Sequence, residues 1–102
     1  MATYAVSPSY GSISPDDGFK LAQFVLPEAG FTIWKERPLG WLLIANQQTS
    51  EGVINATLSF QPTGETVMSL SLASGDHSEQ ALRQAADRFL ALFEDKLPVQ
   101  ND

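Results

Sequence analysis

The residues best suited to acid–base chemistry gather around His77, the only histidine of the chain. Gly75-Asp76-His77-Ser78-Glu79 places an imidazole next to a hydroxyl and between two carboxylates. Side chains adjacent in sequence at the start of a helix point in different directions, so they cannot form a relay of nucleophile, base and orienting acid. We therefore interpret this segment as a helix start, in which Asp76 caps the free amides and Glu79 reaches back.

Metal and phosphate chemistry find little support in the residue types. The chain has no cysteine, which excludes a disulfide, a thiolate nucleophile and the cysteine-containing zinc sites. Asp16-Asp17-Gly18 is too short for a calcium loop, which spreads its ligands over about twelve residues. Gly52, Gly64 and Gly75 stand alone, so no glycine-rich phosphate loop is present. We expect no catalytic residues, no metal site and no cofactor, and hence a non-enzymatic protein.

Composition narrows the class of protein further. The chain has 102 residues, of which 12 are acidic and 6 are Lys or Arg, giving a formal charge of −6. An acidic balance opposes binding to nucleic acid, because phosphate affinity comes largely from Lys and Arg. No apolar run approaches the length of a membrane span, and the first residues lack the features of a signal peptide. These observations predict a small cytoplasmic domain that binds no membrane.

The order of patterns along the chain predicts one α+β domain over residues 14–97. Residues 1–13 show no convincing periodicity, so we expect an irregular N-terminal arm with at most a short edge strand at 3–6. Ser14-Pro15-Asp16-Asp17 is typical of a helix start, and this first helix should be short and end before Phe31. Residues 98–102 follow a proline and are expected to form a disordered polar tail.

Between these segments the hydrophobic period changes to two, as in half-buried antiparallel strands. The predicted strands are 31–37, 41–47, 53–61 and 67–73. Two Pro-x-Gly loops join the first and the last pair of strands, and such loops favour three-residue hairpins with a bulge. This turn chemistry predicts that residue 37 faces 41 and that residue 61 faces 65.

A long amphipathic helix completes the domain. Its apolar stripe begins near Leu82 and continues for about five turns to Leu97. Glu79 and Arg83 stand four residues apart, a spacing that favours an ion pair. The resulting fold is a four-stranded antiparallel β-meander with a short N-terminal helix and a long C-terminal helix packed on the sheet.

The second strand is apolar on both of its faces, which leaves one face in need of a cover. If the loop at 47–51 preserves the alternation, the even-numbered residues of the strands face the long helix and the odd-numbered residues of the first two strands face away. If this loop shifts the alternation by one residue, the two faces exchange roles, but the second strand is still apolar on both sides. The candidate interface on that outer face consists of Phe31, Ile33, Lys35, Arg37, Trp41 and Leu43. Aromatic and arginine side chains together are typical of binding hot spots.

Three covers are possible for this outer face: the N-terminal arm or first helix, another protein subunit, or a ligand. We expect an interaction, assembly or regulatory module that binds a protein partner or itself as a homodimer. The alternative is a small-molecule or cofactor-binding domain that uses a groove between the sheet and the N-terminal helix.

Overall fold

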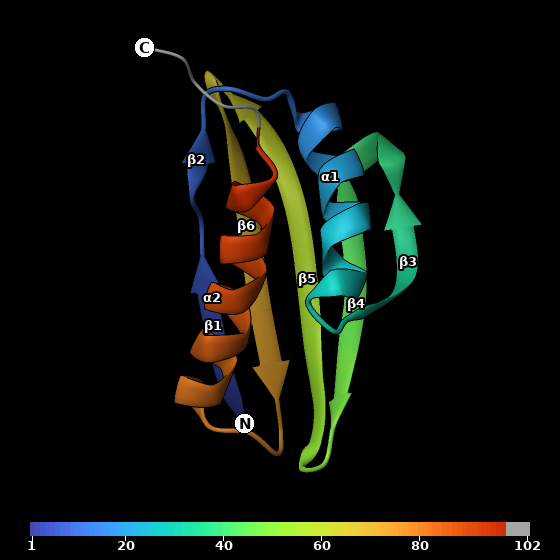
Figure 1. Cartoon of the computed structure of the whole chain (residues 1–102), viewed down its shortest axis with the longest axis vertical. Coiled ribbons are helices and arrows are strands. Elements are labelled where there is room, and N and C mark those ends of the chain that lie inside the picture. Colours follow the sequence, from blue (N-terminus) through green and yellow to red (C-terminus); the bar gives the residue numbers. More distant parts are fainter. Residues whose placement is uncertain (98–102) are drawn as a thin grey trace.

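A computed structural model describes residues 1–97 of the chain (Figure 1). The elements, in order, are β1 (Ala2–Val6), β2 (Ser9–Tyr10), α1 (Pro15–Glu28), β3 (Thr32–Arg37), the 3-10 turn η1 (Pro38–Gly40), β4 (Leu42–Thr49), β5 (Gly52–Thr63), β6 (Glu65–Ser74) and α2 (Glu79–Asp95). The α+β class and the antiparallel sheet are therefore as predicted. The expected tail at 98–102 lies outside the described residues.

The sheet has six strands rather than the four expected from the sequence. Its order is β1-β6-β5-β4-β3, and β2 pairs with β6 beyond the end of β1. Both extra strands come from residues 1–13, so most of the expected irregular arm is part of the sheet. β1 corresponds to the short edge strand that the sequence allowed at 3–6, whereas β2, with two residues, is too short to show any periodicity.

Two hydroxyls set the helix starts. Ser14 Oγ accepts a hydrogen bond from the Asp17 amide at 3.1 Å, as its position before Pro15 predicts. The second helix is capped by Ser78, whose Oγ accepts from the Ala81 amide at 3.2 Å, and not by Asp76 as expected. Ser78 is therefore the capping residue, and α2 begins two residues later than an Asp76 cap implies.

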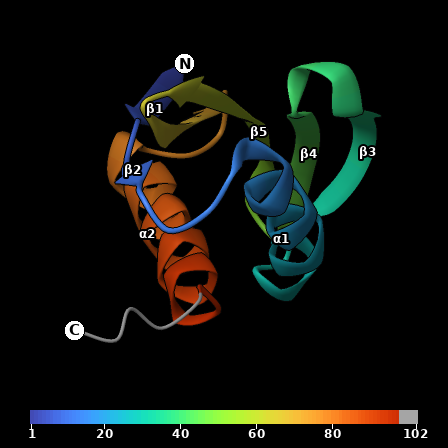
Figure 2. The same cartoon turned by 90° about the horizontal axis from the view of Figure 1, so that it is seen from above.

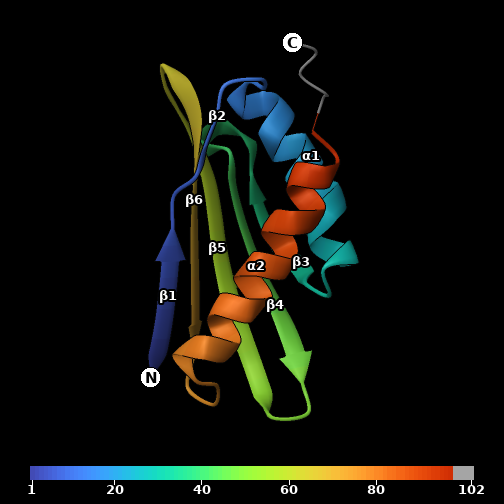
Figure 3. The same cartoon turned by 60° about the vertical axis from the view of Figure 1, so that its left-hand side comes forward.

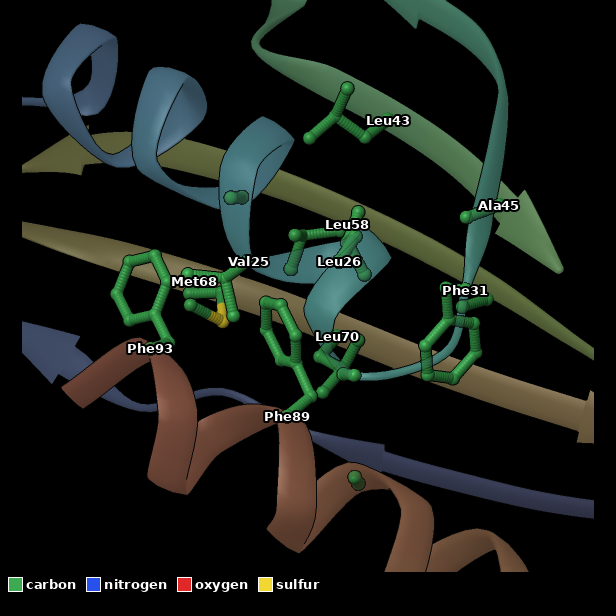
Figure 4. Close-up of a cluster of buried hydrophobic side chains, with 14 of the residues drawn as sticks. Val25, Leu26, Phe31, Leu43, Ala45, Leu58, Met68, Leu70, Phe89 and Phe93 are labelled. Carbon is green, nitrogen blue, oxygen red and sulfur yellow. The ribbon is translucent and has the colours of Figure 1, made fainter. Parts of the chain in front are cut away.

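Both helices lie on the same face of the sheet, side by side, and leave the other face bare (Figures 2 and 3). The core fills the layer between the two helices and the sheet (Figure 4), where Phe89 and Phe93 of α2 and Val25 and Leu26 of α1 are buried. A Cβ at Gly18 would lie 2.7 Å from Phe60 of β5, so the first turns of α1 rest directly on the sheet.

The hairpin between β5 and β6 keeps the predicted faces but not the predicted register. Pro62 faces Thr66, and Phe60 faces Met68, whereas the expected closure of 61 on 65 would place Phe60 opposite Thr66. The strands are thus shifted by two positions. A shift of two leaves every side chain on its predicted face, because the side-chain period of a strand is two. The even-numbered apolar residues of both strands accordingly form the sheet side of the core.

The turn between β4 and β5 reverses the predicted faces of the second strand. Thr49 faces Gly52, so only two residues form this turn, and Leu43 faces Leu58. Odd-numbered residues of β4 therefore share a face with even-numbered residues of β5. Leu43 and Ala45 lie in the core, whereas Leu42 and Ile44 lie on the bare face. The loop therefore does not preserve the alternation, and the two faces of β4 exchange roles, which is the alternative that the sequence left open.

The first hairpin also departs from its prediction. Arg37 faces Leu42 rather than Trp41, and a β-bulge interrupts β3 between Ile33 and Lys35, where Trp34 is the extra residue. Trp41 has φ 49°, the one positive φ outside glycine in the described chain. Trp41 thus closes the 3-10 turn in a left-handed conformation instead of pairing in the ladder.

Candidate functional site

The six residues of the predicted interface do not share one surface. Phe31 and Leu43 are buried in the core, and Ile33 is half-buried on the helix-covered side of the sheet, because it pairs with Ala45. Lys35 and Arg37 pair with Ile44 and Leu42 and so lie on the bare face. Trp41 is half-buried at the turn. Of the six residues, only Lys35 and Arg37 are exposed on the bare face, at the β3 margin of the sheet.

Two side chains outside the predicted interface are exposed beside them. Trp34, which alternation assigned to the core, retains 60% of its accessible surface because the bulge takes it out of the ladder. Leu39, in the middle of Pro38–Gly40, is fully exposed. An apolar residue between the Pro and the Gly of a turn has nothing to pack on. The exposure of Leu39 could therefore have been predicted from the sequence. We call Trp34, Lys35, Arg37, Leu39 and Leu42 the β3–β4 corner.

A hollow of about 620 Å³ opens at this corner. Its lining comes from η1, from the end of β3 and from Leu42 and Ser59 of the bare face. More apolar than polar surface lines it, and Leu39 stands at its margin. The hollow is therefore shaped for an apolar side chain rather than for a charged group.

The bare face itself is nearly free of charge. Cross-strand rows run from Lys35 through Ile44, Thr57 and Ser71 to Ala5, and from Arg37 through Leu42 and Ser59 to Ser69. The only carboxylate that a strand directs to this face is Glu65, at the far end of β6. In a chain of net charge −6, both cations thus stand at one margin of a face of small hydroxyls and aliphatic groups.

His77 occupies a structural position between two hydroxyls. Its Nε2 lies 2.8 Å from Thr49 Oγ1, and its Nδ1 lies 3.0 Å from Ser74 Oγ. Ser74 Oγ also donates to the Val53 carbonyl oxygen at 2.8 Å. Both ring nitrogens are therefore occupied by neutral hydroxyls, and no carboxylate orients the ring as in a catalytic relay. The contacts fasten the start of α2 to the β4–β5 turn.

A second hollow, of about 270 Å³, lies beside this histidine. Gln47 and Thr49 of β4 form its floor, and Gln84 and Arg88 of α2 form one wall. Ala81 and Ala85 keep that wall low, because they carry only a methyl group each. The hollow combines amide and guanidinium donors with the carboxylate of Glu51.

Tyr10 is a buried phenol tied to a carboxylate. Its hydroxyl donates to Glu94 Oε2 at 2.9 Å, and its ring packs 5.4 Å from Phe93. Burial raises the pKa of Tyr10 well above its ordinary value, and the adjacent Glu94 carboxylate raises it further. The neutral phenol is therefore strongly favoured, which is the state required of a donor that holds β2 to α2.

Within residues 1–97, no three His, Asp, Glu or Cys side chains come together as a metal site. No helix of this part of the chain has the length and apolar character needed to cross a membrane. Comparison with models of known protein families gives no match, and no curated protein matches the sequence.

Proposed function

We propose that this protein is a non-enzymatic interaction module that binds a partner protein through the β3–β4 corner. The observation that carries the proposal is the exposure of Trp34 and Leu39 next to Lys35 and Arg37. The remaining large apolar side chains exposed in the described chain are Met1 and Phe24, which lie apart from each other and from the corner.

The physical case rests on what burial would gain. Removing one large apolar side chain from water contributes about 1.5–3 kcal/mol, so Trp34 and Leu39 together would supply about 3–6 kcal/mol, and further contacts at the corner would offset the rest of the cost of association. The hollow beside Leu39 receives an apolar side chain of that partner. Lys35 and Arg37 favour an acidic surface, since opposite potentials raise the association rate and disfavour wrong partners.

The experiment compares three proteins: the wild type, a Trp34→Ala/Leu39→Ala variant, and Phe24→Ala as a matched control that removes an exposed aromatic elsewhere. A photo-activated cross-linking amino acid at position 39, introduced in native cells, identifies the partner. We expect the corner variant to weaken binding of that partner more than about tenfold and the control to leave it unchanged. Equal binding by all three proteins would refute the proposal.

A second candidate function is binding of a small anion in the hollow beside His77. The sequence suggested a groove between α1 and the sheet, where Gly18 comes close to Phe60. Arg88 and the amides of Gln47 and Gln84 provide donors in the other hollow. Small dicarboxylates should then raise the melting temperature by mass action in the wild type and not in Arg88→Ala. No shift for either protein would exclude this candidate.

A further inference from the structure

The outer edge of β1 is an unprotected strand edge. Within residues 1–97 no strand pairs with it on the side away from β6. Ala2–Val6 reads Ala-Thr-Tyr-Ala-Val, with no charge, no proline and no bulge. Natural sheets usually protect their edges with just those features, because a bare edge is a template for pairing with another chain.

The hydrogen-bonding pattern shows which main-chain groups of β1 are free. Met68 N–H donates to the Pro8 carbonyl oxygen at 2.9 Å, so even-numbered residues of β6 direct their main-chain groups toward β1. Their partners are Ala2, Tyr4 and Val6. The N–H and C=O groups of Thr3 and Ala5 therefore point away from β6, toward the open side of the sheet.

We propose that a second copy of this chain pairs with this edge, β1 against β1 and antiparallel, to form one continuous sheet. A two-fold axis perpendicular to the sheet, passing beside Tyr4, places Thr3 opposite Ala5 and Ala2 opposite Val6 of the second copy. This register overlaps the whole strand and pairs the outward-facing groups of Thr3 with those of Ala5 in both directions. The proposal uses a different surface from the β3–β4 corner and does not rest on it.

The α2 helix lies beside the same edge. Tyr4 and the flank of α2 that carries Glu79, Arg83 and Asp87 line a hollow of about 490 Å³. Arg83 makes no ion pair in the described chain, although Glu79 stands at the favourable spacing expected from the sequence. The two-fold axis brings two such flanks together in opposite directions.

Disulfide trapping tests the register directly, because the chain contains no cysteine of its own. In the proposed dimer the two Tyr4 residues form a non-hydrogen-bonded pair with Cα atoms about 4.5 Å apart, which suits a disulfide. We expect Tyr4→Cys to form a covalent dimer in a glutathione buffer. Thr3→Cys and Ala5→Cys should each remain monomeric alone under denaturing conditions and should form a mixed dimer when combined. Lys35→Cys, on the opposite edge, is the matched control and should not cross-link.

Solution mass tests the dimer independently of any cysteine. Light scattering of the wild type should give twice 11.1 kDa, and Ala5→Pro should give the monomer mass, since proline removes an outward N–H that β6 does not use. Ala5→Lys is a second variant that keeps the backbone intact and should have the same effect. A wild type that stays monomeric up to about 1 mM would overturn the dimer. Covalent dimers of Thr3→Cys or Ala5→Cys alone would overturn the register, and cross-linking at Lys35→Cys would overturn the choice of edge.

Discussion

The two edges of the sheet differ in nearly every property that governs strand pairing. β3 is interrupted by a bulge, carries Lys35, Glu36 and Arg37 in succession, and runs directly into a proline. β1 is regular, uncharged and fully paired on its inner side. Because both edges belong to the same sheet and share one core, the difference lies in the edges alone. The β3 edge therefore has features that oppose strand pairing, whereas the β1 edge has none of them.

The same contrast separates two kinds of contact. The β3–β4 corner offers side chains, so a partner there would be recognised by apolar shape and charge. The β1 edge offers main-chain groups, so a partner there would be recognised by strand geometry and register. The two contacts are compatible with each other, since they lie at opposite margins of the sheet.

The largest expected effect is on stability and comes from truncating Phe60, a core side chain that supports both halves of the sheet. Phe60 lies in β5 between the two halves of the sheet, against Gly18 of α1 and 6.1 Å from Phe93 of α2. Phe60→Ala should lower the free energy of unfolding by about 3–5 kcal/mol, measured by denaturant titration, because a buried cavity is created. Phe24→Ala, an exposed aromatic, is the control and should cost less than about 1 kcal/mol. Similar losses for both variants would mean that Phe60 does not join the two halves.

A change of assembly should follow when the protection of β3 is removed. Deleting Trp34 restores a regular ladder, and Lys35→Thr, Glu36→Thr and Arg37→Thr remove the charges. Each copy would then have two unprotected edges, and we expect species larger than a dimer in sedimentation velocity. The triple substitution with Trp34 retained is the control and should show a weaker effect. An unchanged mass would show that these features are not what isolates β3.

The smallest expected effect concerns the tie between β2 and α2 on the β1 side of the sheet. Tyr10→Phe removes the bond to Glu94 and should cost about 1 kcal/mol near neutral pH. The folded-state pKa of Tyr10 is raised above its ordinary value of 10.0, so this contribution is present below pH 10.0 and is lost as the pH rises further. Stability curves of wild type and variant should therefore converge at alkaline pH. Parallel curves would contradict the proposed role of the neutral phenol.

The sequence was sufficient for both helices and for the four strands of the meander, but not for β2 or for the pairing of the strands. Alternation along β5 and β6 correctly assigned the faces of Phe60 and Met68, because the side-chain period of a strand does not depend on its neighbours. β4 is apolar on both sides, so only the length of the turn at Ser50-Glu51 decides which side enters the core. No local signal in the sequence distinguishes that two-residue turn from a loop one residue longer.

The candidate interface failed in part for the same reason. Because the faces of β4 are reversed, Leu43 lies in the core. The bulge in β3 leaves Trp34 exposed, whereas alternation predicted that this side chain would be buried. Lys35 and Arg37 stayed on the outer face because both lie beyond the bulge. A bulge is a property of two paired strands, and alternation within one strand cannot reveal it.

The position of β1 in the chain also determines when its surface comes into being. Within this sequence β1 precedes every other strand, whereas β6, the strand that it pairs with, follows all of them. Closing so long a loop is slow, because its entropy must be lost before the contacts form. β1 therefore has no partner on either side until β6 has been made. Under the proposed dimer, β1 can pair through its outer edge only after β6 has folded against it. Assembly therefore follows completion of the sheet in each copy.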